Sequence, residues 1–434
     1  MRLLAFGVFC AAAASAATNP PQVTFSKDVL PVLQKNCQTC HRPGEAAPFS
    51  LLTYKEARPW AAAMKEAVLS KKMPPWFADP HYGKFANDPS LSKPEIDTLV
   101  AWAETGAKEG NLSDAPKALA FENGWRIGKP EWVIEMPAAF DVPAAGTVDY
   151  QYFLVPTGFK EDKYVRLAEA RPGNRQLVHH IIAFIREPGS PWMKDLKPGV
   201  PFVPKQDTRR GGGDGGGGFG GEFLVGYAPG TVPELLKEGQ AKLIKAGSDI
   251  ILQMHYTANG KAGTDKSRVG FVFTNEAPKE RVFMLAAADG KFAIPPGDPN
   301  YEVHSTFQIQ ADTKLESFLP HMHFRGKDFE YRAKYPDGKT ETLLSVPKYD
   351  FNWQLSYYLQ QPKVLPKGTI IECTAHFDNS ANNKYNPDPT KEVHFGEQTW
   401  EEMMIGFFEV SFDPSLNPMD LMRPPKQQQK KASD

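Results

Sequence analysis

Proline occurs throughout this chain and limits the elements that it can form. The 434 residues include 39 prolines, and 39/434 is 9%, against about 5% in average proteins. Because proline removes a backbone donor and breaks helix interiors, long helices are disfavoured. At roughly 150 residues per domain, the length allows about two to four domains. We therefore expect a multidomain chain in which short β-strands dominate.

Composition and charge exclude two classes of protein. Hydrophobic residues make up 41% and charged residues 23% of the chain, which is typical of a globular protein and not of a disordered one. Lys and Arg total 50 against 51 Asp and Glu. Such a balance lacks the positive excess that attracts phosphates, so we expect no nucleic-acid partner.

The N-terminus is typical of a secretory signal peptide over residues 1–16. A positive charge precedes the apolar stretch Leu3–Ala13, and the small residues Ala14–Ala16 form a cleavage site. Cys10 would permit a lipid anchor, but the bulky residue before it disfavours that processing. No later run reaches the ~18 apolar residues of a membrane span. We expect a periplasmic or secreted protein, cleaved near Ala16.

The motif Cys37-Gln38-Thr39-Cys40-His41 predicts covalent attachment of haem c. Two thioethers from Cys37 and Cys40 would hold the porphyrin edge, and His41 would ligate the iron. A redox-active dithiol would need a thioredoxin-like βαβ context, and a zinc site would need a second cysteine pair. Neither is present.

The flanks of this motif predict a small helical domain. Ser26 can cap a helix that precedes the cysteines, and Ser92-Lys93-Pro94-Glu95 is a capping box that begins a second helix. Terminal helices around a central haem resemble the all-α cytochrome c fold. We place this domain at residues 24–112.

A second iron ligand should follow downstream. Met73 lies between a lysine and two prolines, which fix an extended loop that can present a side chain. Met64 has the spacing of a core residue on a helix, and His81 has the context of a solvated loop residue. We predict Met73 as the ligand, and a methionine at this position raises the haem potential.

The remainder of the chain reads as short strands after a linker at 111–123. Phe329–Tyr335 alternates apolar and polar residues, Pro336-Asp337-Gly338 provides a turn, and Thr340–Leu344 returns as a hairpin. Many strands at this spacing indicate sandwiches or jelly rolls. The glycine tract at 211–221 lacks a phosphate-binding pattern, and a disordered tail is expected over 416–434.

Five histidines fall within three apolar, strand-like segments. His321 and His323 are two residues apart, so on a strand they project to one face and can share a metal. His179 and His180 are adjacent and would point to opposite faces unless the strand twists or bulges. His255 lies in Leu252-Gln253-Met254-His255-Tyr256. Because a buried imidazole is costly without a partner, the pattern favours metal binding.

The ligand type narrows the choice of metal. Imidazole sites suit zinc, copper, iron or nickel, and an added thioether favours Cu(I). Met403 and Met404 offer that thioether. From spacing alone, both could equally be core residues of a strand.

The order of these segments resembles a known family. From about Trp125 to Phe412 the chain is similar to the copper type II, ascorbate-dependent monooxygenases, the group of peptidylglycine hydroxylating and dopamine β-monooxygenases. The matching pieces are the His-His pair, the Gln-Met-His-Tyr segment, the His-Met-His segment and the late Glu-Met pair. The bacterial form fused behind a cytochrome c module is an even closer match.

The resemblance implies two jelly-roll sandwiches, which we place at 124–277 and 278–415, each holding one copper ion. It implies an electron-transfer copper held by His179, His180 and His255. It implies an oxygen-activating copper held by His321, His323 and Met403, with Met403 preferred because the family's ligand follows an acidic residue. These last three residues would be the catalytic ones.

The family inserts oxygen from O₂ into a C–H bond of a small organic substrate, with ascorbate as reductant. Here the tethered haem offers another electron source, and we expect a redox partner protein as a second possible donor besides ascorbate. The substrate remains open, because the residues that bind peptides or catecholamines cannot be matched. His304, His376 and His394 match no family ligand.

Two other functions fit less well. A copper nitrite reductase would need a ligating cysteine followed closely by His and Met, and Cys373 has no such sequence after it. Cys373 reads instead as a buried strand residue. A non-enzymatic electron-transfer or copper-carrying protein is the alternative that the sequence leaves open.

Overall fold

The computed structural model describes residues 22–422, with gaps at 46, 122–123, 205–220, 230 and 232. The predicted signal peptide and nearly all of the glycine tract lie outside the described residues, as does the tail beyond residue 422. Strands hold 37% of the chain and helices 13%, so the expected dominance of β-structure is confirmed. No helix in the described part of the chain is long and apolar enough to cross a membrane.

The chain forms two compact units. The first contains the residues up to Arg42, Phe49–Met73 and Leu91–Leu119, and the second contains Pro43–Pro48, Pro74–Ser90 and the chain from Ala120 onward. Two segments within the predicted domain 24–112 therefore cluster with the second unit.

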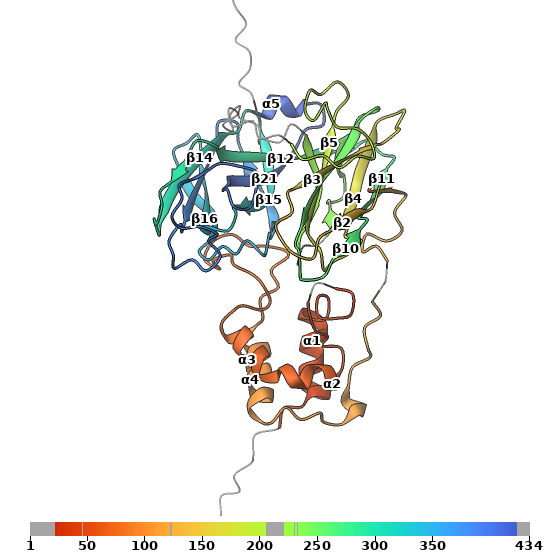
Figure 1. Cartoon of the computed structure of the whole chain (residues 1–434), viewed down its shortest axis with the longest axis vertical. Helices are drawn as coiled ribbons and strands as arrows, with labels where there is room; N and C mark the ends of the chain where they lie inside the picture. The colour runs from red at the N-terminus through yellow and green to blue at the C-terminus, as the bar shows by residue number, and fades with distance from the viewer. Residues whose placement is uncertain are drawn as a thin grey trace, which may run out of the picture. The chain divides into compact units, whose positions relative to one another are not determined.

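The first unit is helical (Figure 1). Its elements are η1 (Phe25–Val29), α1 (Leu30–Asn36), α2 (Tyr54–Ala57), η2 (Arg58–Trp60), α3 (Ala61–Leu69), α4 (Lys93–Glu104) and η3 (Leu112–Asp114). The predicted capping box of Ser92 and Glu95 begins α4. Ser26 does not cap the first helix: Thr24 is the extended residue before it, and Ser26 is the buried second residue of η1. A core that includes Phe25, Leu33 and Trp102 joins these helices.

The second unit contains two four-stranded sheets and one long sheet, and each four-stranded sheet packs over its own core (Figure 1). One four-stranded sheet has the order β3 (Gln151–Pro156), β9 (Asp249–Tyr256), β5 (Val178–Arg186), β6 (Glu222–Tyr227). The other has the order β14 (Tyr301–Gln308), β19 (Ile370–Phe377), β16 (Gly326–Lys334), β17 (Thr340–Val346).

One long sheet in the described chain faces both of these. Its order is β1 (Trp132–Glu135), β11 (Arg268–Thr274), β4 (Lys163–Arg171), β8 (Gln240–Ile244), β12 (Glu280–Asp289), β21 (Met404–Phe412), β15 (Thr313–His321), β18 (Tyr357–Leu365), with β7 (Glu234–Leu235) paired to β4. We call the half before β12, with its facing sheet, the first sandwich, and the half from β12 the second sandwich. Two small pairs complete the unit: β2 (Phe140–Val142) with β10 (Gly263–Asp265), and β13 (Ala293–Ile294) with β20 (Val393–His394).

The two sandwiches meet at a parallel pairing of β8 with β12 and at a buried ion pair. Lys242 Nζ lies 2.7 Å from Glu409 Oε1, and Ser317 Oγ donates to the other carboxylate oxygen of Glu409 at 2.9 Å. Both charges are almost fully buried. Because loss of one partner would leave an uncompensated buried charge, this pair disfavours separation of the sandwiches.

Residues 74–90 cover the outer strand of the second sandwich. Phe85 pairs with Leu359 of β18, and the Ala86 N–H donates to Tyr358 O at 2.8 Å. Trp76 packs on Tyr357, with ring centroids 4.7 Å apart. Backbone groups of an exposed edge strand are thereby satisfied.

The predicted hairpin is confirmed as β16 and β17, with buried and exposed residues alternating along β16. The Gly338 N–H donates to Tyr335 O at 2.9 Å, and Gly338 has a φ of +86°, which glycine adopts readily. The predicted tail 416–434 begins too early. Pro418–Met422 form helix α5, because Leu421 is fully buried in the core of the second sandwich.

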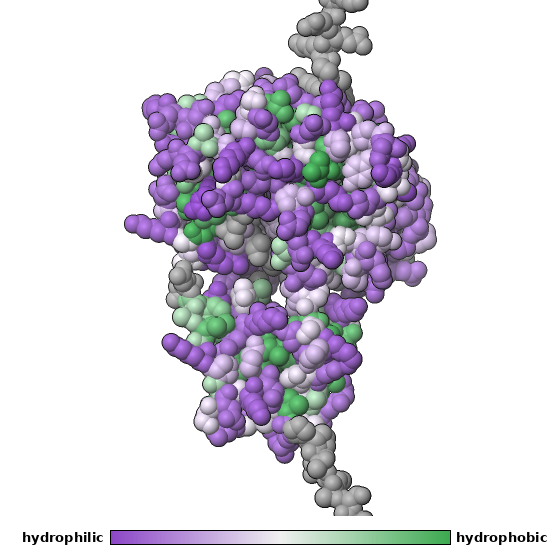
Figure 2. Space-filling view, turned by 180° about the vertical axis from the view of Figure 1, so that it is seen from behind, coloured by the Kyte–Doolittle hydropathy of each residue, from purple (hydrophilic) through white to green (hydrophobic). Residues whose placement is uncertain are grey.

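Polar residues cover most of the face seen in Figure 2, and apolar residues form small separate patches. This distribution agrees with burial of the large apolar side chains in the cores of the two units.

Candidate metal centre

Three histidines of the first sandwich converge. One nitrogen from each of His179, His180 and His255 lies within 4.8 Å of the others. His180 and His255 face each other directly across the β5–β9 pair. The structure therefore brings together the three histidines that the resemblance assigns to one metal.

A β-bulge at His179 makes this convergence possible. Val178 pairs with Tyr256 and His180 pairs with His255, so His179 is an extra residue on β5. A bulge changes the direction of the side chains beside it. Adjacent histidines can share an ion only if the strand bulges or twists there. The bulge at His179 meets this requirement.

His180 and His255 are buried, His179 is partly buried, and one nitrogen of each ring lacks a partner. His179 Nδ1, His180 Nε2 and His255 Nδ1 are buried without any hydrogen bond. Burial lowers the pKa of His179 to about 4 and holds the pKa values of the other two well below the usual range. Neutral imidazoles with unpaired ring nitrogens are costly to bury, and a metal ion would satisfy all three. The donor set thus fits a metal such as copper.

The second histidine cluster lies at the end of β15. His321 is the last residue of that strand and His323 follows in the loop, with ring centroids 5.2 Å apart and planes at 90°. Gln354 Oε1 lies 3.0 Å from His321 Nδ1, and Glu401 O lies 3.2 Å from His323 Nδ1. These contacts orient both rings and leave Nε2 of each as the nitrogen for a ligand. His323 Nε2 is buried without a partner.

Glu402 fixes the loop that carries His323. Its carboxylate accepts the backbone N–H of His323 at 2.8 Å and of Arg325 at 2.6 Å. Burial raises the pKa of Glu402 to about 8 even though these N–H donors favour the ionised form. Glu402 therefore positions a histidine and directly precedes the candidate methionine ligand.

The two neighbouring methionines have different surroundings. Met403 lines a cavity together with His321, whereas Met404 is fully buried in the core of the second sandwich. Ser305 Oγ donates to Met404 Sδ at 3.2 Å. Because side chains alternate along a strand, only one of the pair can face the histidines, and the structure presents Met403.

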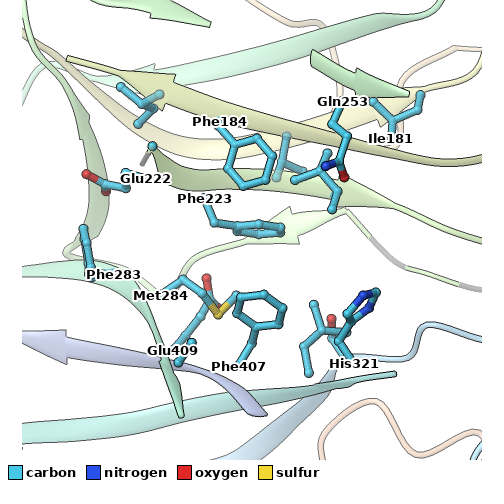
Figure 3. Close-up of a pocket in the computed structure, with 18 of the residues that line it drawn as sticks. Ile181, Phe184, Glu222, Phe223, Gln253, Phe283, Met284, His321, Phe407 and Glu409 are labelled. Carbon is cyan, nitrogen blue, oxygen red and sulfur yellow. The ribbon is translucent and has the colours of Figure 1, made fainter. Parts of the chain in front are cut away.

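A cavity of about 580 Å³ lies between the sandwiches (Figure 3). It is bordered by His180 of the triad and by His321 and Met403 of the second cluster. Its middle is apolar: Phe184 and Phe223 lie on one side and Phe407 on the other (Figure 3). The volume suits a small organic molecule, which would then lie beside both histidine clusters.

Several residues of this centre carry no signal in the sequence. Tyr150 packs against His180 and His255 with its hydroxyl buried and unpaired, and Gln354 and Phe351 reach the histidines from a loop of the second sandwich. Their spacing along the chain is irregular. Only the pairing of distant strands brings them to the site.

The helical unit holds the proposed haem residues. Cys37 and Cys40 are not joined in a disulfide, and burial is the main cause that raises the pKa of Cys37 to about 12. His41 Nδ1 lies 3.3 Å from Phe49 O, so Nε2 remains for an iron ligand. Met73 follows α3, but the described hydrogen bonds and ring contacts do not link it to His41. Haem attachment at Cys37 and Cys40, with His41 and Met73 as iron ligands, stays a prediction.

The remaining histidines lie on the surface beside carboxylates. His304 pairs with Glu302 at 2.7 Å, His376 contacts Asp328 at 2.6 Å, and His394 contacts Glu392 at 3.0 Å. His81 pairs with Asp79 in the same way. These partners account for the imidazoles without a metal.

Cys373 lies on β19 and is buried, as the sequence predicts, and burial raises the pKa of its thiol well above the usual range. Gly406 of β21 lies against it: a Cβ there would be 2.5 Å from the Cys373 sulfur. Close packing explains the position of this cysteine, which takes no part in the metal centre.

No protein-family model matches the chain, and no curated protein matches it. Among solved structures it is similar to an allantoicase, with 8% identity over 55% of this chain and 79% of the other and a TM-score of 0.18. It is also similar to the VP2 subviral particle of infectious bursal disease virus, with 10% identity over 68% and 75% of the two chains and a TM-score of 0.18. Such low TM-scores carry no argument about function.

Proposed function

We propose that this chain is a copper-dependent monooxygenase that hydroxylates a C–H bond of a small, largely apolar organic molecule, with electrons supplied through an attached haem c. In this proposal the helical unit is a cytochrome c-like module and the two sandwiches are jelly rolls. One observation carries it: two histidine clusters that contain buried, unpaired ring nitrogens border the same cavity, one through His180 and the other through His321.

The reaction consumes one O₂, two electrons and two protons, and yields the hydroxylated product and water. Bound copper would supply one-electron redox chemistry and an open position for O₂. His179, His180 and His255 would hold one ion in a three-nitrogen set. His321, His323 and Met403 would hold the other, where the soft thioether favours Cu(I).

The chain's own residues orient the histidine rings and line the cavity. Gln354 and the Glu401 carbonyl set the ring orientation of His321 and His323. Phe184, Phe223 and Phe407 line the middle of the cavity from its two sides and would contact the apolar body of the substrate. A C–H bond presented beside His321 and Met403 would then meet the oxygen-activating site.

The haem assignment is supported by the sequence motif Cys37-Gln38-Thr39-Cys40-His41. Ascorbate or a redox partner protein would reduce the haem, and the haem would reduce the copper of the triad. If Met73 is the second iron ligand, its replacement slows reduction of copper. If Met73→Ala reduced copper at the wild-type rate, this result would contradict the proposed electron path through a haem ligated by Met73.

The deciding experiment measures substrate-dependent O₂ uptake and hydroxylated product with copper-loaded, haem-containing protein. The panel contains alkylbenzenes, alkylamines and acylated short peptides. His323→Ala should lower product formation at least about 100-fold, because a ligand contributes more than the 10–100-fold of an outer-shell partner.

His376→Ala is the matched control, since this histidine lies on the same sandwich but pairs with Asp328 on the surface. It should retain full activity. Copper binding without substrate-dependent O₂ uptake across the panel would instead favour a copper-carrying or electron-transfer protein.

A further inference from the structure

A chain of hydrogen bonds runs from a loop of the second sandwich into the first sandwich. Glu397 lies between β20 and β21, and its Oε2 accepts the hydroxyl of Tyr152 on β3 at 3.3 Å. The same hydroxyl accepts a hydrogen bond from Gln253 Nε2 on β9. Glu397 and Gln253 also line the cavity, and Figure 3 shows the amide of Gln253 turned into it. A carboxylate of one sandwich is thus connected to a buried amide of the other.

Strand register places this amide beside the triad. Tyr152 pairs with Gln253 across β3 and β9. His180 pairs with His255 across β5 and β9. Gln253 and His255 are two residues apart on β9, so their side chains project from the same face of the sheet. Gln253 is therefore a diagonal neighbour of His180 on that face, at a separation that a long side chain can bridge.

The pKa shifts of the linked groups give the direction of each hydrogen bond. Burial holds the pKa of His180 well below its usual range, and a hydrogen bond with the Gln253 side chain raises it in part. A bond that favours the protonated ring is one in which the ring donates, so the amide oxygen accepts. Burial is the main cause that raises the pKa of Tyr152; the bond with Gln253 lowers it and the bond with Glu397 raises it. The hydroxyl therefore accepts from the amide and donates to the carboxylate.

Every donor in this chain of hydrogen bonds points toward Glu397. The order is His180 ring, Gln253 amide, Tyr152 hydroxyl and Glu397 carboxylate, and Nε2 of His180 has no partner and remains for a metal ion. Burial raises the pKa of Glu397, whereas the bond from Tyr152 favours its ionised form. Hydrogen bonds aligned in this way polarise one another inside a protein. The charge of Glu397 therefore makes the His180 ring a better electron donor to a metal.

The loop that carries Glu397 also holds the second cluster. Glu401 O lies 3.2 Å from His323 Nδ1, and the carboxylate of Glu402 accepts the His323 N–H at 2.8 Å. Met403 borders the cavity at the end of this loop. Residues 397–403 therefore contact the second cluster directly and reach the triad through two intervening side chains.

We propose that Glu397 is the supporting carboxylate of the triad and sets the balance between the oxidised and reduced forms of the metal held there. This inference rests on the proposed function, which assigns a copper ion to the triad. A histidine whose second ring nitrogen donates toward a carboxylate is fixed in orientation and is a more basic ligand. A more basic ligand and a nearby negative charge both favour Cu(II) over Cu(I). Glu397 acts through Tyr152 and Gln253, so it is a positioning residue that makes the triad a stronger electron donor.

The test compares the affinity of the triad for Cu(I) and Cu(II) and needs neither substrate nor O₂. Every protein is the full haem-containing chain with His321→Ala, so that the second cluster lacks a ligand. Each is dialysed against a Cu(I) chelator and, separately, against a Cu(II) chelator, and bound copper is measured by atomic absorption. Glu397→Gln keeps an acceptor for Tyr152 and removes the charge. It should raise the ratio of Cu(I) to Cu(II) affinity about tenfold, which corresponds to about 59 mV in reduction potential.

Two further variants make the result specific. Tyr152→Phe breaks the chain of hydrogen bonds but keeps Glu397, and it should raise the same ratio. In that background Glu397→Gln should add less than about twofold, because residues in one network have non-additive effects. Glu392→Gln is the matched control: this carboxylate precedes Glu397 in the same segment but pairs with His394 on the surface at 3.0 Å, so the ratio should not change.

The inference is overturned if Glu397→Gln leaves the ratio unchanged or weakens both oxidation states equally, as a merely structural role would. Additive effects of Glu397→Gln and Tyr152→Phe would also overturn it. Urea unfolding of the metal-free proteins shows which variants fold. If Glu397→Gln does not fold, Tyr152→Phe decides alone, and an unchanged ratio in that variant overturns the inference.

This test separates failure of the inference from failure of the proposed function. A starting protein that binds no copper at the triad contradicts both. An unchanged ratio in variants that bind copper contradicts the role of Glu397 alone, and because no turnover is measured, the hydroxylation experiment above is independent of it.

Discussion

The two histidine clusters of this protein are built in different ways. The triad of His179, His180 and His255 lies on two paired strands, and a bulge turns one side chain toward the other two. The second cluster lies at a strand end, where His323 depends on a loop held by Glu402. Both clusters reach the same cavity, the first through His180 and the second through His321. They differ in support, because paired strands hold the triad and a hydrogen-bonded loop holds His323.

The largest expected effect comes from breaking the triad. His255→Ala should lower bound copper by one ion per chain and leave the second cluster loaded, because a missing ligand weakens binding by more than about 100-fold. Metal analysis after dialysis against a weak chelator measures this. A variant that retains both ions would show that the three histidines are not one site.

Substituting Met403 and Met404 in turn compares the side of β21 that faces the cavity with the side that faces the core. Met404→Ala should destabilise the protein by about 2–5 kcal/mol, because it opens a cavity in the core, and should not change copper binding. Met403→Ala should cost less stability and weaken Cu(I) binding at least about tenfold. Denaturant unfolding and competition with a Cu(I) chelator measure the two effects. The reverse pattern would assign Met404 as the ligand.

A pH series compares the buried imidazoles of both clusters in metal-free protein. The pKa values are about 4 for His179, about 4 for His321 and about 3 for His323, against 6.5 for the unfolded chain. Below pH 6.5 the unfolded chain binds more protons, so stability falls as pH drops toward 4. The slope is at most about 1.4 kcal/mol per pH unit for each histidine.

Glu402 acts in the opposite direction. Its pKa is raised to about 8, so it destabilises the fold as pH rises from 4.5 toward 8. His179→Gln isolates the histidine contribution, because it should flatten the slope between pH 6.5 and 5 while leaving Glu402 intact. An unchanged slope, measured by urea unfolding, would mean that His179 is not desolvated.

The smallest effect is expected at the surface. His304→Gln should change neither copper content nor the free energy of unfolding measurably, because the pair with Glu302 is exposed to solvent. Loss of copper in this variant would show that ligands lie outside both clusters. The proposal that only buried histidines hold copper would then be wrong.

Those parts of the fold that depend on short sequence patterns could be predicted from the sequence. The capping box before α4, the hairpin of β16 and β17 and the buried position of Cys373 follow from patterns within a few residues. The errors have tertiary causes. We placed residues 416–434 in a disordered tail, yet 418–422 form a helix, because Leu421 packs in the core of the second sandwich.

The candidate site follows the same division. The histidine segments could be recognised because five imidazoles in apolar, strand-like surroundings are unusual. The choice between Met403 and Met404 could not be made from spacing, and Phe351 and Gln354 gave no signal at all. Their positions depend on a loop that reaches the other sandwich.

By itself, the sequence determined the haem-attachment motif, the predominance of strands and the supply of imidazole and thioether donors. These depend on residue type and on short spacings. The tertiary structure alone decided which donors meet, because the direction of a strand side chain depends on register and bulges set by a distant partner strand. The bulge at His179 is a consequence of that pairing, and Phe351 stacks on this histidine from the other sandwich.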